Sequence, residues 1–117
     1  MGQTARFQET LRRLAIFDEG FVPAGSGPGP DEALAVDART AALLRLAAAV
    51  ALGSSAVCLE WGTGRALAAG ATKDEIADVL LAIAPVAGLA RVVSAAPALA
   101  TALGYDVEAA LAEPDDR

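Results

Sequence analysis

The chain has 117 residues, a formal net charge of −6, one cysteine and no histidine. These counts exclude a histidine-containing catalytic triad, a histidine metal ligand and an intrachain disulfide within one copy of the chain. The hydrophobic content of 55% includes thirty alanines, which favour helix but bury little area each. We therefore expect one modest core whose elements pack closely or share burial with a partner chain.

Charge and hydropathy limit the partners of this chain. The sequence pI of about 4.4 and the absence of a basic stripe argue against nucleic-acid binding. The mean hydropathy is +0.45, but the longest apolar stretch, residues 79–90, is shorter than the ~20 residues that a bilayer span requires. The polar N-terminus contains no signal-peptide h-region. We expect a cytoplasmic protein that binds neither nucleic acid nor membrane.

The first thirty residues differ in character from the rest. Residues 3–17 are predicted to form an amphipathic helix, since Phe7, Leu11 and Leu14 recur at helical spacing. Residues 20–30 hold seven of the chain's seventeen Gly and Pro residues, a density that excludes a helix or strand interior. We predict that residues 1–30 are a docking arm and that residues 31–117 are a helical domain.

Capping signals divide the second region into helices. Asp37 is a candidate N-cap, Ser54 or Ser55 is another, and Thr72 with Glu75 forms a Thr-x-x-Glu capping box. The expected helices cover residues 37–52, 54–70, 73–85 and 86–103, the last bent at Pro97, with one more turn over residues 106–112. No alternating strand pattern is present, so we predict an all-α fold of about five to six helices.

The helix expected at residues 54–70 carries an unusual pair of glycines. Gly62 and Gly64 occupy its interior, where each costs ~1 kcal/mol relative to alanine. Either another backbone approaches closely at this point, or the glycines keep space open for a ligand. Cys58 and Arg65 lie on the same face as Gly62, and Trp61 lies beside that face.

Cys58 and Glu60 are the candidate catalytic residues. Cys58 is the sole possible thiol nucleophile; a helix N-terminus upstream and Arg65 downstream favour its thiolate, whereas Glu60 opposes it. The alternative is that Cys58 is a small buried side chain. Glu60 is the single acid between Asp37 and Asp74, which makes it a candidate for proton transfer or a solvated surface residue.

Three arginines are candidates for holding a carboxylate. Arg45 and Arg91 each stand alone in apolar helices, so each must pair with an acid or face a polar cavity. The candidate acids are Glu60, Glu75 and Asp78. In the alternative, Arg45, Arg65 or Arg91 holds the carboxylate of a substrate and Trp61 forms the pocket wall. No residue set indicates a metal or an organic cofactor.

The stretch from Asp37 to about residue 90 resembles the carboxymuconolactone decarboxylase and alkylhydroperoxidase D superfamily. The matching features are the Leu-rich first helix of this stretch, the ALAAGAT turn, the DEI of the capping box and the step Gly88-Leu89-Ala90-Arg91. The resemblance implies an all-α protein that assembles into homodimers, trimers or hexamers through a shared helical core.

The same resemblance bears on the chemistry. The peroxidase branch carries a Cys-x-x-Cys pair followed by a histidine. Cys58 falls on its second cysteine, Ser55 on its first and Gly62 on the histidine, while Leu43 falls near its glutamate. Trp61 resembles the tryptophan of some decarboxylase-like members. The resemblance therefore implies the decarboxylase-like branch, with the usual histidine replaced by Gly62.

The resemblance, together with the residues present, implies three alternative functions. The first is a cofactor-free lyase for a small carboxylated or lactone-like molecule, with Glu60 transferring protons. The second is a thiol-dependent alkylhydroperoxidase that uses Cys58 and an external thiol, or Cys58 of another subunit, to complete its cycle. The third is a non-catalytic homo-oligomer that binds a ligand or partner on a retained scaffold.

Overall fold

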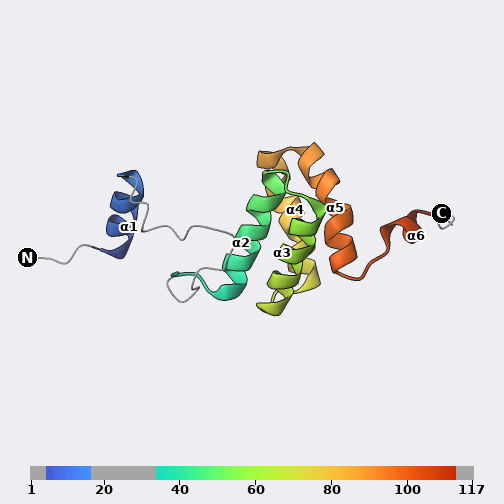
Figure 1. The fold of residues 1–117 in the computed structure, drawn as a ribbon, viewed down its shortest axis with the longest axis horizontal. Coiled ribbons are helices and arrows are strands. Elements are labelled where there is room, and N and C mark those ends of the chain that lie inside the picture. The colour runs from blue at the N-terminus through green and yellow to red at the C-terminus, as the bar shows by residue number, and fades with distance from the viewer. Residues whose placement is uncertain (1–4, 17–33, 113–117) are drawn as a thin grey trace, which may run out of the picture. The chain divides into compact units, whose positions relative to one another are not determined.

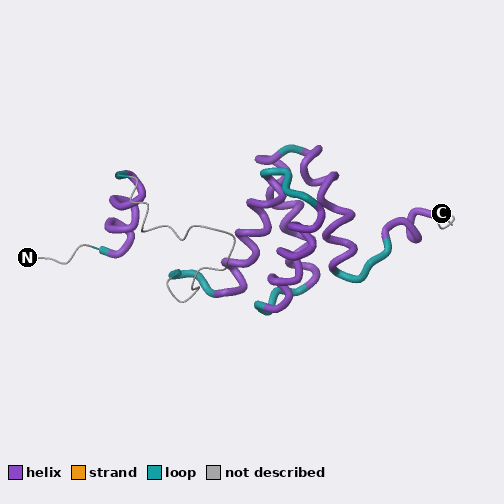
Figure 2. Tube along the Cα trace, viewed as in Figure 1, coloured by secondary structure: helices purple, strands orange, loops and turns teal. Residues whose placement is uncertain are grey.

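The structure is a computed structural model that describes residues 5–16 and 34–112. Within these ranges every regular element is a helix, which confirms the predicted all-α class (Figures 1 and 2). The chain divides into two units, Met1–Pro30 and Asp31–Arg117. The Gly/Pro-rich loop expected at residues 20–30 lies outside the described residues.

The first unit contains the helix α1, Arg6–Ala15. The expected helix at residues 3–17 is therefore present, although residues 3–4 and 17 lie outside the described part. Phe7 and Leu11 are exposed along one side of α1. The Arg12 guanidinium bonds the Glu9 carboxylate at 2.8 Å and lowers the pKa of Glu9. The docking role proposed for this arm stays a prediction.

The second unit contains five helices, of which four form a helical body. They are α2 (Ala38–Ala51), α3 (Ala56–Ala68), α4 (Lys73–Ala87) and α5 (Leu89–Ala102), followed by the short α6 (Val107–Ala112). Helix α3 packs against both α2 and α5, and α4 packs against α2 and α5 (Figure 1). The large side chains of the core are Leu46, Val50, Leu59, Ile76, Val79, Val92 and Leu99. Alanines fill the space between them, which lets the helices approach closely.

The helix starts follow the predicted caps. The Asp37 carboxylate accepts a hydrogen bond from the Thr40 amide at 2.7 Å, and Ser55 rather than Ser54 caps α3. In the capping box of α4, the Glu75 amide donates to Thr72 Oγ1 at 3.0 Å and the Thr72 amide donates to Glu75 Oε1 at 2.9 Å. These side chains satisfy amides that a helix N-terminus leaves without partners.

One helix boundary differs from the prediction. Helix α4 passes through Pro85 and ends at Ala87, and Gly88, with φ of +96°, separates it from α5. A proline so close to the helix C-terminus removes one hydrogen bond without preventing the last turn, whereas a backbone at positive φ leaves the helical conformation. The break therefore falls at the glycine and not at the proline.

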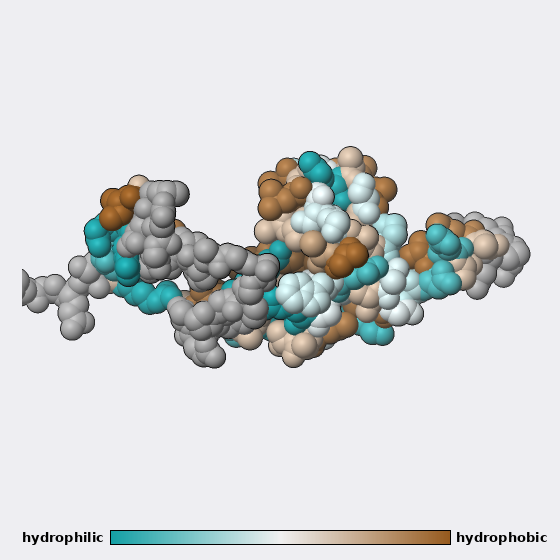
Figure 3. Space-filling model, in the orientation of Figure 1, coloured by the Kyte–Doolittle hydropathy of each residue, from teal (hydrophilic) through white to brown (hydrophobic). Residues whose placement is uncertain are grey.

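The surface of the second unit is unevenly apolar. Around the junction of α4 and α5, Val86, Leu89 and Val93 are 91%, 71% and 63% exposed. Figure 3 shows brown, hydrophobic side chains over the end of the body where these two helices meet. None of the helices in the described ranges is both long and apolar enough to cross a membrane.

Candidate functional site

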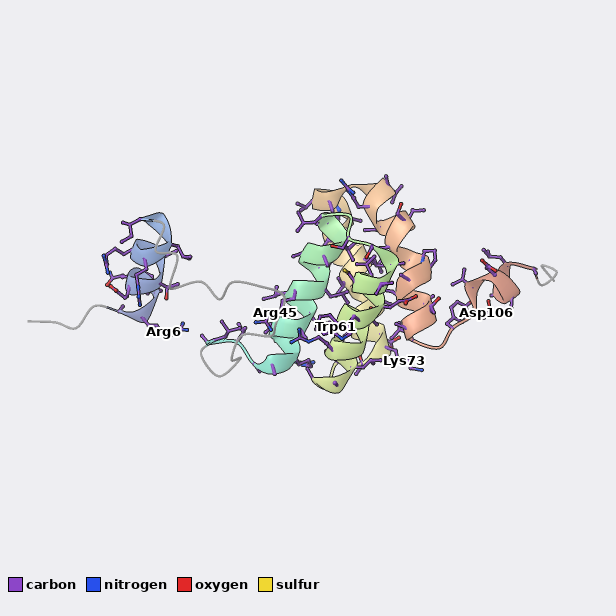
Figure 4. All side chains as sticks on the ribbon, viewed as in Figure 1. Arg6, Arg45, Trp61, Lys73 and Asp106 are labelled. Carbon is purple, nitrogen blue, oxygen red and sulfur yellow. The ribbon has the colours of Figure 1, made fainter. Side chains whose placement is uncertain are left out.

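A pocket of about 150 Å³ lies between α2 and α3. Its lining residues are Ala42, Arg45, Leu46 and Ala49 from α2 and Trp61, Gly62 and Arg65 from α3. In Figure 4 the side chains of Arg45 and Trp61 lie next to each other where the two helices face. A cavity of ~150 Å³ is large enough to hold a benzene molecule. The pocket therefore has room for one small ring.

The two interior glycines have different surroundings. A Cβ atom on Gly62 would lie 3.4 Å from Leu46 Cδ1, an ordinary van der Waals contact with a side chain, and would take up space in the pocket that Gly62 lines. A Cβ atom on Gly64 would meet no described atom within 4 Å. Of the two explanations offered for the glycine pair, the space for a ligand therefore applies to Gly62, and the close approach of another backbone does not. Neither applies to Gly64 within the described part of this chain.

The pocket mouth is cationic and aromatic. The guanidinium carbon of Arg65 lies 5.3 Å from the centre of the Trp61 ring, within the range of a cation–π interaction. This stacking places the charge of Arg65 beside an exposed indole face. Arg45 contributes a second guanidinium from α2, and the lining contains no carboxylate. The pocket consequently favours an anionic group attached to a small apolar body.

The candidate catalytic residues Cys58 and Glu60 do not line this pocket. Cys58 lies in the first turn of α3 with its thiol exposed, so its interpretation as a small buried side chain is wrong. The half-buried Glu60 precedes Trp61 by one residue, and one residue is a rotation of about 100° around a helix. The acid therefore lies on a neighbouring face of α3.

Arg91 is separated from the other two arginines. It lines a different cavity, with Gly53, Ser54 and Ser94. The structure thus brings Arg45, Arg65 and Trp61 together and places Arg91 elsewhere. Of the acids considered as arginine partners, Glu75 bonds Arg39.

The pocket beside α6 is less suited to an anionic ligand. This larger, more open pocket of about 410 Å³ is lined by the carboxylates Asp106 and Glu108, which repel anions. Among the described residues, no group of three or more His, Cys, Asp or Glu side chains is arranged to hold a metal ion.

Sequence reasoning missed the α2 wall of the pocket. Ala42, Leu46 and Ala49 recur at helical spacing and face α3. The same pattern predicts core positions in any helix, so it gave no sign of a cavity. The shortage of side-chain volume opposite Trp61, caused by the two alanines and Gly62, is the signal that could have found it.

The fold and the pocket define a small all-helical protein with a ligand-sized cavity between two neighbouring helices. Residues 33–101 match the model of the carboxymuconolactone decarboxylase family. The match contains α2, α3, α4 and nearly all of α5, more than half of the chain, and the chain belongs to this family. Among curated proteins and among solved structures, no significant match was found. Gly62, on which the sequence resemblance places the family's histidine, lines the pocket.

Proposed function

We propose that this protein binds a small cyclic carboxylate or lactone acid in the α2–α3 pocket. The observation that carries the proposal is the placement of two guanidinium groups and one indole at the mouth of an otherwise apolar cavity of about 150 Å³. Arginine binds carboxylates through two parallel hydrogen bonds. The ligand's ring would then rest on Leu46 and Gly62 with one edge against Trp61.

The finer proposal is that the bound acid is decarboxylated without a cofactor. The bond between the ring carbon and its carboxylate breaks and releases CO2, and the electron pair is delocalised into the lactone carbonyl as an enolate. A guanidinium beside that carbonyl stabilises the developing negative charge. A proton must then reach the ring carbon. The pocket lining supplies no acid, so the donor is either water or Glu60 from the neighbouring face of α3.

Binding can be followed through Trp61, the single tryptophan of the chain. We would titrate the protein with benzoate, a ring carboxylate of suitable size, and record the indole fluorescence. Replacing Arg65 by Gln should weaken binding ~10-fold, because a hydrogen bond to a charged group contributes at least that factor. Lys73→Gln, which removes the same charge from the exposed start of α4, should leave the affinity unchanged. A signal that fails to saturate, or equal losses in both variants, would contradict the proposal.

Turnover is tested separately. Release of CO2 from carboxymuconolactone would support the lyase, and Glu60→Gln distinguishes the two proton sources, since only a Glu60-dependent step would slow in that variant. Binding without turnover would leave the non-catalytic binding function.

A second candidate function rests on the exposure of Cys58 in the first turn of α3. A helix N-terminus stabilises a thiolate. Attack of that thiolate on a hydroperoxide breaks the O–O bond, forms a cysteine sulfenic acid and releases an alcohol after proton uptake; an external thiol then reduces the sulfenic acid. Intact mass after one equivalent of peroxide, with a thiol trap, tests this step. Oxidation no faster than that of a free model thiol would remove this candidate.

We also propose that a second copy of the chain covers the α4–α5 junction. Its three aliphatic side chains, Val86, Leu89 and Val93, are among the most exposed of the body, and the alanine-rich core buries few large residues in compensation. Val86→Lys should shift the protein toward monomer in sedimentation experiments. Ala77→Lys, at an exposed α4 position near Asp74 and Asp78, is the matched control. Identical sedimentation of both variants and the unmodified protein would contradict the assignment.

A further inference from the structure

A second cavity, of about 190 Å³, lies where the turn between α2 and α3 meets α5. Three polar side chains line it: Ser54 from the turn, and Arg91 and Ser94 from α5. Within the described ranges, none of these side chains forms a hydrogen bond or ion pair. Three donor side chains without intramolecular partners thus line this one cavity.

The guanidinium of Arg91 is held in place by the backbone of the turn. A Cβ atom on Gly53 would lie 1.9 Å from Arg91 Nη1 and 2.9 Å from Arg91 Cζ, so the guanidinium lies directly against this glycine. Gly53 itself has φ of +73° and ends α2. The charge is therefore positioned by packing rather than by an acidic partner.

The donor side chains come from two elements that line the cavity, the α2–α3 turn and α5. Ser94 follows Arg91 by three residues and lies on the same face of α5, whereas Ser54 approaches from the α2–α3 turn. Ser54 also directly precedes the N-cap residue of α3, whose N-terminus adds partial positive charge. The lining contains no acidic residue.

We propose that this cavity binds a phosphate group. The two oxygens of a carboxylate are already satisfied by one guanidinium, whereas donors on two walls match the larger number of oxygens on a phosphate. Below the polar rim the floor is apolar, formed by Val50, Leu59 and Ala95. The ligand class that fits both parts is free phosphate or a phosphate monoester with a small apolar body.

This site is separate from the carboxylate pocket between α2 and α3. The two cavities share no lining residue. Arg45 and Gly53 are eight positions apart, which corresponds to ~12 Å along a helix. Failure of carboxylate binding in the α2–α3 pocket would therefore leave the phosphate proposal unaffected.

The test is a titration of the 15N-labelled protein with sodium phosphate at constant ionic strength. The backbone amides of Gly53 and Ser54 should shift and saturate. Arg91→Gln should weaken binding ~10-fold or more, and Arg91→Lys should restore part of it, since lysine keeps the charge but not the planar fork. Lys73→Gln should bind phosphate as the unmodified protein does. Thermal unfolding of each variant without phosphate confirms that it is folded.

Two further ligands identify the occupant. If phenyl phosphate binds more tightly than phosphate, the apolar floor holds the organic body of a phosphate monoester. If the two affinities are equal, the site binds free phosphate. Both results support the site. Shifts that do not saturate, equal affinity in Arg91→Gln, or shifts of the same size with benzoate would overturn it.

Discussion

Gly62 and Gly64 offer a matched pair of substitutions that tests the pocket directly. Both residues lie in the interior of α3, two positions apart, and replacing either by alanine improves helix propensity by ~1 kcal/mol. Their surroundings differ. The new methyl group at Gly62 would contact Leu46 Cδ1 at 3.4 Å on the pocket floor, and the one at Gly64 would contact no described atom within 4 Å.

The expected magnitudes follow from this difference. Gly64→Ala should raise the free energy of unfolding by ~1 kcal/mol, or the Tm by ~4–8 °C for a domain of this size, and leave benzoate affinity unchanged. Gly62→Ala should gain about as much stability, because its methyl group would meet Leu46 Cδ1 at 3.4 Å, an ordinary van der Waals contact. The methyl group of Gly62→Ala enters the pocket, and overpacking against the ligand of ~1–3 kcal/mol should weaken benzoate binding ~5- to 150-fold.

Urea unfolding followed by circular dichroism gives the stabilities, and Trp61 fluorescence gives the affinities. All variants are compared at one protein concentration, since self-association would otherwise contribute to stability. If Gly62→Ala binds benzoate as tightly as the unmodified protein, Gly62 does not form the floor of a binding pocket. If Gly64→Ala is less stable than the unmodified protein, atoms outside the described part of this chain contact α3 at Gly64, and the space beside Gly64 is not open.

Three further substitutions test the body. Leu46→Ala should lower the free energy of unfolding by ~2–5 kcal/mol and also weaken benzoate binding, because Leu46 is 1% exposed and belongs to both the core and the pocket wall. Asp37→Ala should cost ~1 kcal/mol of stability through loss of the α2 N-cap, measured by urea unfolding. Hydrogen bonding by the Thr72 amide and contact with Arg39 lower the pKa of Glu75. The ionised carboxylate therefore stabilises the fold at pH values above the ordinary pKa of glutamate. This contribution to stability is lost as the pH falls through the lowered pKa. The stability difference between the unmodified protein and Glu75→Gln should accordingly shrink below pH ~4, and a difference that grows in acid would contradict this assignment.

The helices could be predicted from sequence because their starts depend on local side chains. Thr72 and Glu75 satisfy each other's amides within one turn, and no distant residue is needed to recognise this. The boundary near Pro85 was misplaced because a helix accepts a proline in its last turn. Gly88 determines where α4 ends, and Pro85 lies within that last turn. Local signals of this kind fix the order and approximate length of the helices.

The candidate site was predicted only in part. Trp61 and Arg65 share one helix, so their proximity follows from helical spacing. Arg45 joins them because α2 and α3 are consecutive and pack on each other. Arg91 was grouped with them on charge alone. Its actual position beside Gly53 depends on which end of α5 meets the α2–α3 turn, and this is set by packing of the whole core. No local pattern contains that information.

The short turns of the body have a consequence for the rate of folding. Gly53 and Gly70, both at positive φ, allow α2 to turn directly into α3 and α3 into α4. Two pairs of consecutive helices, α2 with α3 and α4 with α5, then pack on each other, whereas α3 and α4 barely touch. Small helical domains fold within microseconds to milliseconds. The proposed assembly with a second copy would depend on protein concentration and would be slower. Refolding should therefore show a fast phase at every protein concentration, and the proposed assembly would add a slower phase whose rate rises with concentration.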